Sequence, residues 1–207
     1  NGIFQCLLVF NYLGHSGPFG LTQERVLTVN DIGAWDNKYK MPLFITATCT
    51  FSPYDDPEAN SGGELVLHNE KGGGIALYST VRAVFSGSNK RLNDAVFSRL
   101  FKRYDGETGT LGEIIINAKN ANSADTLKDN ARKFALLGDP ALKLAVPEHK
   151  ISVTRINGSD DLYPLQDTLN ALEKVTVEGE VRNQQDELIP DFDGILHVTV
   201  FDKAQTK

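Results

Sequence analysis

The sequence predicts an α/β fold: a mostly parallel sheet flanked by helices, followed by part of an antiparallel β-sandwich. Two short runs, 7–10 and 43–45, are rich in Leu, Val, Ile and Phe, like strands buried on both faces of a parallel sheet. The segment between them is long enough for the crossover helix that parallel neighbours require. After Pro147, apolar and polar residues alternate, which is typical of antiparallel strands.

The composition is that of a globular protein and argues against several functional classes. Of the 207 residues, 41% are hydrophobic and 23% are charged, near the globular average. The net charge of −6, without a Lys/Arg cluster, argues against a nucleic-acid partner. No apolar run approaches the about 18 residues of a membrane-spanning helix. The chain has no initiator Met and begins and ends in strand-like runs, so a piece of a longer protein is expected.

Apolar runs predict strands at 1–13, 42–48 and 75–79, and a further strand or helix end at 133–137. A glycine-rich loop, 14–20, follows the first strand. The glycines 72–74 lack the Gly-Lys-Ser/Thr ending of a phosphate loop, so they predict a tight entry to the third strand. Asp139 could be a functional acid, but it lies in Gly-Asp-Pro, a sequence typical of turns, so a structural turn residue is expected.

Polar caps and apolar spacing predict the helices. Thr28, Ser61 and Thr110 resemble N-caps, and Asp31 and Glu113 stand three positions after the first and the last of them. These caps predict a short helix through residue 35, one over 62–68 and one from 111. The clearest helix is predicted by apolar residues at helical spacing: Leu92, Val96, Phe97, Leu100, Phe101 and Tyr104.

The last part of the chain has strand periodicity. Residues 151–154, 175–178 and 196–200 alternate apolar and polar side chains. His197 is expected on the surface of the last strand. Residues 191–194 resemble a calcium loop but lack the tail of an EF-hand, so a turn is expected.

The two cysteines have different surroundings. Cys6 lies within an apolar run, where a free Cys packs as a small hydrophobe. Cys49 and His15 each follow a predicted parallel strand, and function collects at the carboxyl ends of such strands. Adjacent strands lie about 4.8 Å apart, so His15 could reach Cys49 as the base that activates a thiol nucleophile. The structural alternative is an ordinary loop Cys beside an ordinary loop His.

The motifs around these two residues resemble those of gingipain-like cysteine peptidases, which have a caspase-like fold. The similar segments are Asn11–His15, Thr46–Cys49, Tyr54–Pro57, Ser61–Glu64, Gly72–Ala76 and Leu137–Leu142. The similarity covers about residues 1–147 and is greatest to the PorU-type sortases of the type IX secretion system. It implies that 1–147 is the C-terminal part of a peptidase domain, with the sheet incomplete at its N-terminus, and that 148–207 begins an immunoglobulin-like β-sandwich.

The resemblance also implies an activity. Cys49 and His15 would be the catalytic residues of an endopeptidase or transpeptidase, and the backbone N–H groups of Ser16 and Cys49 would hold the oxyanion. The implied partners are proteins with a C-terminal sorting signal and other secretion-system components, at the bacterial outer-membrane surface. The family commonly has Gly where this chain has Ser16. The rival class is therefore a non-catalytic surface or scaffold protein with the same fold. A generic α/β hydrolase is disfavoured, because no Gly-x-Ser-x-Gly motif is present.

Two further features, Arg82 and an acidic loop, have structural alternatives. Arg82 stands where the family lines its substrate pocket, but an ion pair explains it equally well. No cofactor is expected. Calcium held by the acidic side chains of 55–64 is the alternative to a solvated loop. Strands missing before the first one would leave an exposed edge, which predicts self-association or a rearranged sheet, and little activity from this piece alone.

Overall fold

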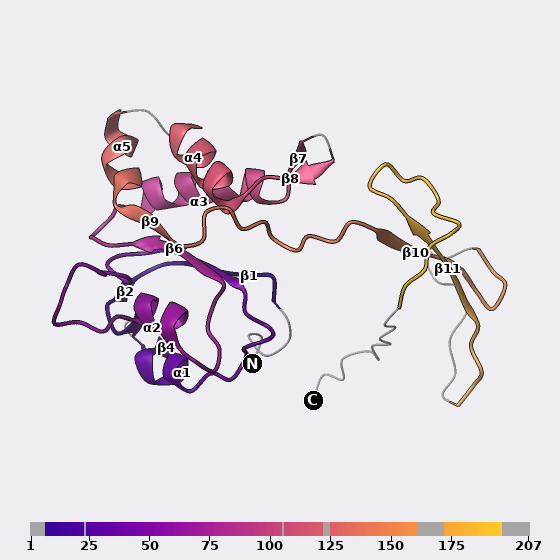
Figure 1. Cartoon of the computed structure of the whole chain (residues 1–207), viewed down its shortest axis with the longest axis horizontal. Helices are drawn as coiled ribbons and strands as arrows, with labels where there is room; N and C mark the ends of the chain where they lie inside the picture. Colours follow the sequence, from indigo (N-terminus) through magenta and orange to yellow (C-terminus); the bar gives the residue numbers. More distant parts are fainter. Residues whose placement is uncertain (1–6, 23, 105, 122–124, 161–171, 196–207) are drawn as a thin grey trace. The chain divides into compact units, whose positions relative to one another are not determined.

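The structure, a computed structural model, describes residues 7–22, 24–104, 106–121, 125–160 and 172–195. The chain divides into two compact units, residues 1–146 and 147–207 (Figure 1). The first unit contains the sheet that carries the candidate residues.

A four-stranded sheet forms the centre of the first unit. Its strands are β1 (Val9–Leu13), β5 (Leu43–Ala47), β6 (Ala76–Thr80) and β9 (Phe134–Gly138), in the order β1-β5-β6-β9. The pairs β1–β5 and β5–β6 are parallel, and β9 is antiparallel to β6. The prediction of a mostly parallel sheet is confirmed. β1 lies at an edge of this sheet, and self-association through it stays a prediction.

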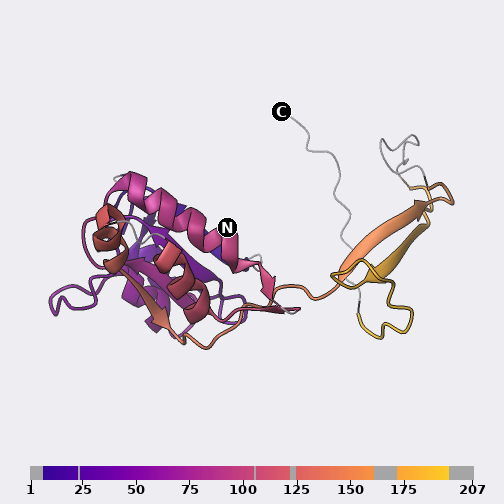
Figure 2. The same ribbon diagram turned by 90° about the horizontal axis from the view of Figure 1, so that it is seen from above.

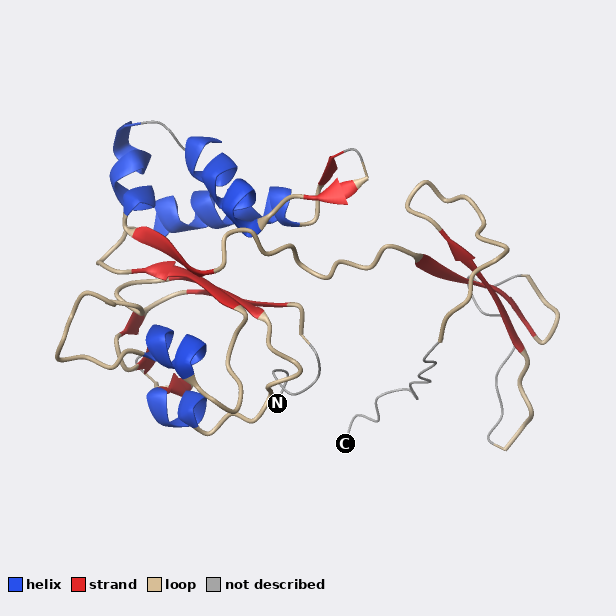
Figure 3. Cartoon of the chain, viewed as in Figure 1, coloured by secondary structure: helices blue, strands red, loops and turns tan. Residues whose placement is uncertain are grey.

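Helices cover both faces of the sheet (Figure 3). On one side lie α1 (Val29–Gly33) and α2 (Gly62–His68). The other side carries α3 (Ser86–Leu100), α4 (Leu111–Ala121) and α5 (Asp125–Arg132), which Figure 2 shows from above. Side chains alternate along a strand, so Leu43 and Ile45 pack into the α3–α4–α5 core and Phe44 into the α1–α2 core. All five residues of β5 are buried, as the apolar run predicts.

The predicted N-caps are present in the structure. Thr28 and Asp31 form a capping box at α1, as Ser61 and Glu64 do at α2. At the start of α4, the Thr110 N–H donates to Glu113 Oε2 at 2.8 Å. Capping depends on contacts within four residues, which is why a single sequence predicts it well.

Several predicted boundaries are wrong. The helix assigned by the spacing of 92–104 begins earlier, at Ser86, and ends at Leu100. Phe101 and Tyr104 therefore lie outside it, and Tyr104 belongs to the hairpin β7 (Arg103–Tyr104) and β8 (Glu107–Thr108). The predicted loop 14–20 contains β2 (Ser16–Gly17) and leads into β3 (Gly20–Leu21), and β3 pairs with β4 (Leu27–Thr28). α5 was not predicted, because its sequence is largely polar.

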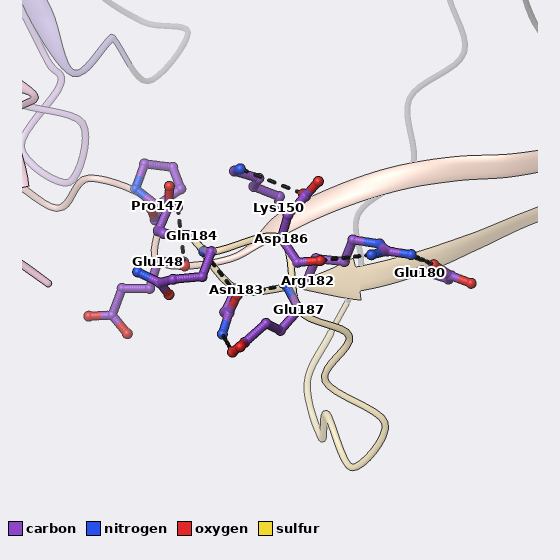
Figure 4. A network of polar contacts seen from close by, with 10 residues as sticks. Pro147, Glu148, Lys150, Glu180, Arg182, Asn183, Gln184, Asp186 and Glu187 are labelled. Carbon is purple, nitrogen blue, oxygen red and sulfur yellow. Dashed lines mark hydrogen bonds and ion pairs between the residues drawn. The ribbon is translucent and has the colours of Figure 1, made fainter.

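The second unit contains an antiparallel pair, β10 (Lys150–Ile156) and β11 (Val177–Arg182). β11 begins later than the predicted strand 175–178. The turn after β11 bonds to itself and to the start of the unit (Figure 4): the Gln184 side chain donates to the Pro147 carbonyl at 3.1 Å, and Lys150 pairs with Asp186. The remaining sandwich strands stay a prediction.

Some predictions lie outside the described residues: the role of Cys6, and the strand 196–200 with His197. None of the described helices is long and apolar enough to cross a bilayer.

Candidate active site

His15 and Cys49 lie at the same end of the sheet, just beyond the carboxyl ends of β1 and β5. β1 and β5 are adjacent and parallel, with Leu13 opposite Ala47 at their carboxyl ends. Each candidate residue follows its strand by two positions. The pairing continues one step beyond the strands, because the Gly14 N–H donates to the Ala47 carbonyl at 3.4 Å. The two residues therefore lie on neighbouring loops at one end of the sheet.

The His15 peptide is fixed by two donors. The Tyr12 hydroxyl and the Thr22 backbone N–H both donate to the His15 carbonyl, each at 2.9 Å. Burial raises the pKa of Tyr12 above its ordinary value, so at neutral pH the hydroxyl keeps the proton that it donates. Thr22 has a φ of 65°, which is uncommon for a β-branched residue. The loop thus holds the His15 backbone in place while the side chain is exposed.

The turn at Cys49 contains a second strained threonine. Thr50 has a φ of 47°, and the left-handed conformation costs a non-glycine residue about 1–2 kcal/mol. Such strain persists only where surrounding contacts stabilise it, and it is concentrated at functional sites. Here two hydroxyls bind the carbonyls that flank the Cys49 Cα: Thr80 Oγ1 donates to the Thr48 carbonyl and Ser16 Oγ to the Cys49 carbonyl, both at 2.5 Å. Each bond is worth about 0.5–1.5 kcal/mol net, so together they offset the strain.

The start of α2 joins the two loops. The first N–H groups of a helix have no partner inside it. Here the Gly62 N–H donates to the Pro18 carbonyl at 2.7 Å, and the Gly63 N–H donates to the Phe51 carbonyl at 3.1 Å. Pro18 belongs to the loop after His15, and Phe51 to the loop after Cys49. One helix end therefore positions both loops.

The Cys49 thiol is half-buried and contacts a third loop. Its Sγ lies 3.6 Å from the Val84 carbonyl, which follows β6. Among the described contacts, no hydrogen bond joins this thiol to the His15 ring. Catalytic hydrogen bonds are often long or misaligned before substrate binds, so this geometry is compatible with a resting dyad.

The two predicted oxyanion donors are the backbone N–H groups of Ser16 and Cys49. Ser16 and Leu21 are opposite each other in the antiparallel β2–β3 pair. The neighbouring bond, from the Thr22 N–H to the His15 carbonyl, shows that Ser16 and Leu21 form a non-hydrogen-bonded pair. The Ser16 N–H therefore points away from β3. Within the described part of the chain, the Cys49 N–H has no acceptor. Both backbone groups are thus outside the sheet ladders.

Arg82 forms a two-pronged ion pair with Asp55 in the loop after Cys49. Arg82 Nη1 donates to Asp55 Oδ1 at 2.9 Å, and Nη2 contacts Oδ2. Both side chains are about half exposed. The structural alternative predicted for Arg82 is thus observed, and the pair ties the loop after β5 to the loop after β6.

We expect the Arg82→Ala substitution to raise the pKa of Asp55 towards its ordinary value of 3.8. The hydrogen bond from Arg82 is the main cause that holds this pKa below that value. The pair therefore stabilises the fold above pH 3.8, and this contribution is lost as the pH falls through the depressed pKa. Carboxyl NMR of the parent and the variant measures the change. An unchanged Asp55 titration in Arg82→Ala, with Lys90→Ala as control, would show that the ion pair does not persist in solution.

Three of the four acidic residues considered for calcium, Asp55, Asp56 and Glu64, have other partners. Asp55 bonds to Arg82, and Glu64 Oε2 accepts the Ser61 N–H at 2.9 Å. Among the described residues, no group of three or more His, Cys, Asp or Glu side chains could hold a metal ion. A large open pocket of about 950 Å³ lies elsewhere, beside α4 and the β7–β8 hairpin, and neither His15 nor Cys49 lines it.

Sequence reasoning did not assign roles to Tyr12, Thr22, Thr50 or the Ser16 hydroxyl. The only signal was the departure from the family pattern at Ser16. Left-handed backbone at a Thr has no sequence signature, because it is imposed by tertiary contacts.

Comparison with known proteins identifies a matching peptidase family and structures with a similar fold. The profile of peptidase family C25 matches residues 1–145. Two solved structures share the fold: a complex of the Porphyromonas gingivalis RgpB pro- and mature domains (16% identity, TM-score 0.60) and the Arg-specific cysteine proteinase gingipain R (14% identity, TM-score 0.61). Each match covers 73% of this chain, which spans 38% and 37% of those chains.

A structure of dimeric latent PorU from Porphyromonas gingivalis also matches, with 30% identity over 57% of this chain and 11% of that chain, at a TM-score of 0.35. No curated protein sequence matches. The family match extends over most of the chain, and the gingipain structures share its fold. The chain belongs to peptidase family C25.

Proposed function

We propose that this chain carries the catalytic dyad of a cysteine peptidase, with Cys49 as nucleophile and His15 as general base. The observation that supports this best is the equal offset of the two residues past the Leu13–Ala47 pair of adjacent parallel strands. The strained turn after Cys49 is a second support, since strain of this kind is concentrated at functional sites.

The proposed chemistry is acyl transfer. His15 accepts the Cys49 proton, and the thiolate adds to the carbonyl carbon of a peptide bond. The backbone N–H groups of Ser16 and Cys49 donate to the oxyanion that forms. His15 then returns the proton to the departing amine, which leaves an acyl thioester on Cys49. Water or an acceptor amine completes the reaction by displacing the thiol.

We propose C-terminal sorting signals of secreted proteins as the substrates, at the surface of a bacterial cell. The motif similarity to PorU-type sortases supports this finer assignment, including secretion-system components as partners. Residues 148–207 are proposed as the start of a β-sandwich domain, which the antiparallel β10–β11 pair supports.

A non-catalytic scaffold is the second candidate. The Cys49 thiol contacts the Val84 carbonyl, and Ser16 replaces the usual Gly. Both features would suit a fold kept without its chemistry. The intact Cys–His pair at one sheet edge opposes this reading.

The pH dependence of thiol labelling at Cys49 tests the proposal. We expect a chloroacetamide probe to label Cys49 at pH 6 almost as fast as at pH 8, with peptide mass spectrometry separating Cys49 from Cys6. An ordinary thiol with a pKa of about 8.5 would slow roughly 80-fold over that interval, because only the thiolate reacts. A Cys49 rate that falls by that factor would favour the scaffold.

A further inference from the structure

The residue after the candidate base has a side-chain role that a glycine could not supply. The Ser16 hydroxyl is partly buried and donates to the Cys49 carbonyl at 2.5 Å, across 33 positions of sequence. It joins the loop after β1 directly to the turn after β5.

The carbonyl that Ser16 binds controls the orientation of Cys49. It belongs to the peptide between Cys49 and Thr50, and Thr50 has the left-handed φ of 47°. The direction of this carbonyl depends on the ψ angle of Cys49, so the bond from Ser16 limits rotation about the Cα–C bond of Cys49. The preceding peptide is held by Thr80 through the Thr48 carbonyl. Without the Ser16 hydroxyl, the strained side of the turn loses its polar contact.

The other end of the link is rigid as well. The His15 carbonyl accepts two hydrogen bonds, from Tyr12 and Thr22. Ser16 is the next residue, so its hydroxyl extends from a fixed peptide. A contact between two fixed peptides sets the separation of the loops that carry the base and the nucleophile.

We infer that Ser16 is a positioning residue, whose hydroxyl holds the Cys49 turn at the distance and orientation at which His15 can take the thiol proton. The inference rests on the proposed function. The role requires a side-chain hydroxyl, which the glycine that is common at this position in the family does not have.

A nearly isosteric pair of variants tests the inference. Ser16→Thr keeps the hydroxyl, and Ser16→Val replaces it by a methyl group of similar size. We expect the Val variant to label Cys49 at pH 6 about five- to tenfold more slowly than the Thr variant, and at pH 9 to label at least as fast as the Thr variant, because an uncoupled thiolate is more basic. A merely structural role would move the unfolding midpoint but not this pH profile. Circular dichroism verifies that both variants fold.

A matched control removes a similar bond elsewhere. The Ser98 hydroxyl donates to the Ala95 carbonyl at 3.0 Å on the exposed face of α3, and Ser98→Ala should label like the parent at both pH values. Equal rates for Ser16→Thr and Ser16→Val at pH 6 would overturn the inference. If His15→Ala slows labelling in the same experiment, the dyad stands and only the role of Ser16 fails. If His15→Ala has no effect either, the proposed function fails.

Discussion

Replacing Gly73 by Ala is expected to destabilise the first unit by about 3–5 kcal/mol, at the upper end of single substitutions. Gly73 has a φ of 111°, and a Cβ at this position would lie 2.0 Å from the Val66 carbonyl oxygen. The backbone penalty and the steric clash act together. Since native domains are stable by only about 5–15 kcal/mol, a chemical-denaturation midpoint should shift strongly.

The obstructing atom cannot move easily. Val66 is fully buried in α2, and its carbonyl accepts the Gly74 N–H at 2.8 Å. On the other side, the buried Asn37 side chain accepts from the Gly73 N–H at 2.8 Å and donates to its carbonyl at 3.0 Å. Relief of the clash would break one of these bonds. The start of α2 binds the loops that follow His15 and Cys49, so the damage should extend to the candidate site.

Substitutions at two other glycines separate the backbone penalty from the steric clash. Gly106 has a φ of 86° with open space around it, so Gly106→Ala reports the backbone penalty alone, about 1–2 kcal/mol. Gly87 lies in the first turn of α3, also in open space and without a positive φ. Gly87→Ala should therefore stabilise slightly, by about 0.5–1 kcal/mol. A Gly73→Ala effect no larger than that of Gly106→Ala would refute the clash at Val66.

The fold was predictable wherever it depends on local pattern. The caps at Thr28, Ser61 and Thr110 depend on contacts within one helical turn. The start of α3 does not: its N-cap, Phe85, makes no side-chain cap, and the Phe85 N–H instead donates to Asn130 Oδ1 at 2.9 Å. That partner is 45 positions away, so no local pattern encodes it.

The same distinction applies to the candidate site. The positions of His15 and Cys49 at one sheet edge could be predicted, because each follows a buried strand of a parallel pair. The contacts that fix them could not. The Ser16–Cys49 bond depends on a turn whose left-handed Thr50 is imposed by contacts from β6 and from the loop after β1.

The substitution His15→Ala is expected to have the largest effect on chemistry, and the effect should depend on pH. An ordinary thiol is about 0.3% thiolate at pH 6, so a thiolate paired with a His has an advantage of roughly 300-fold in population. A less basic thiolate is a weaker nucleophile, which offsets part of this advantage. We therefore expect labelling of Cys49 in His15→Ala to slow by about tenfold at pH 6.

At high pH the order should reverse. Once both proteins carry a thiolate, the more basic thiolate of His15→Ala reacts at least as fast as that of the parent. The two rate–pH curves should therefore cross, which loss of access alone would not produce, and circular dichroism verifies that His15→Ala is folded. His68→Ala, at an exposed His in the last turn of α2, should follow the parent throughout. Superimposed curves for His15→Ala and the parent would show that His15 does not act on Cys49, and the dyad would have to be abandoned.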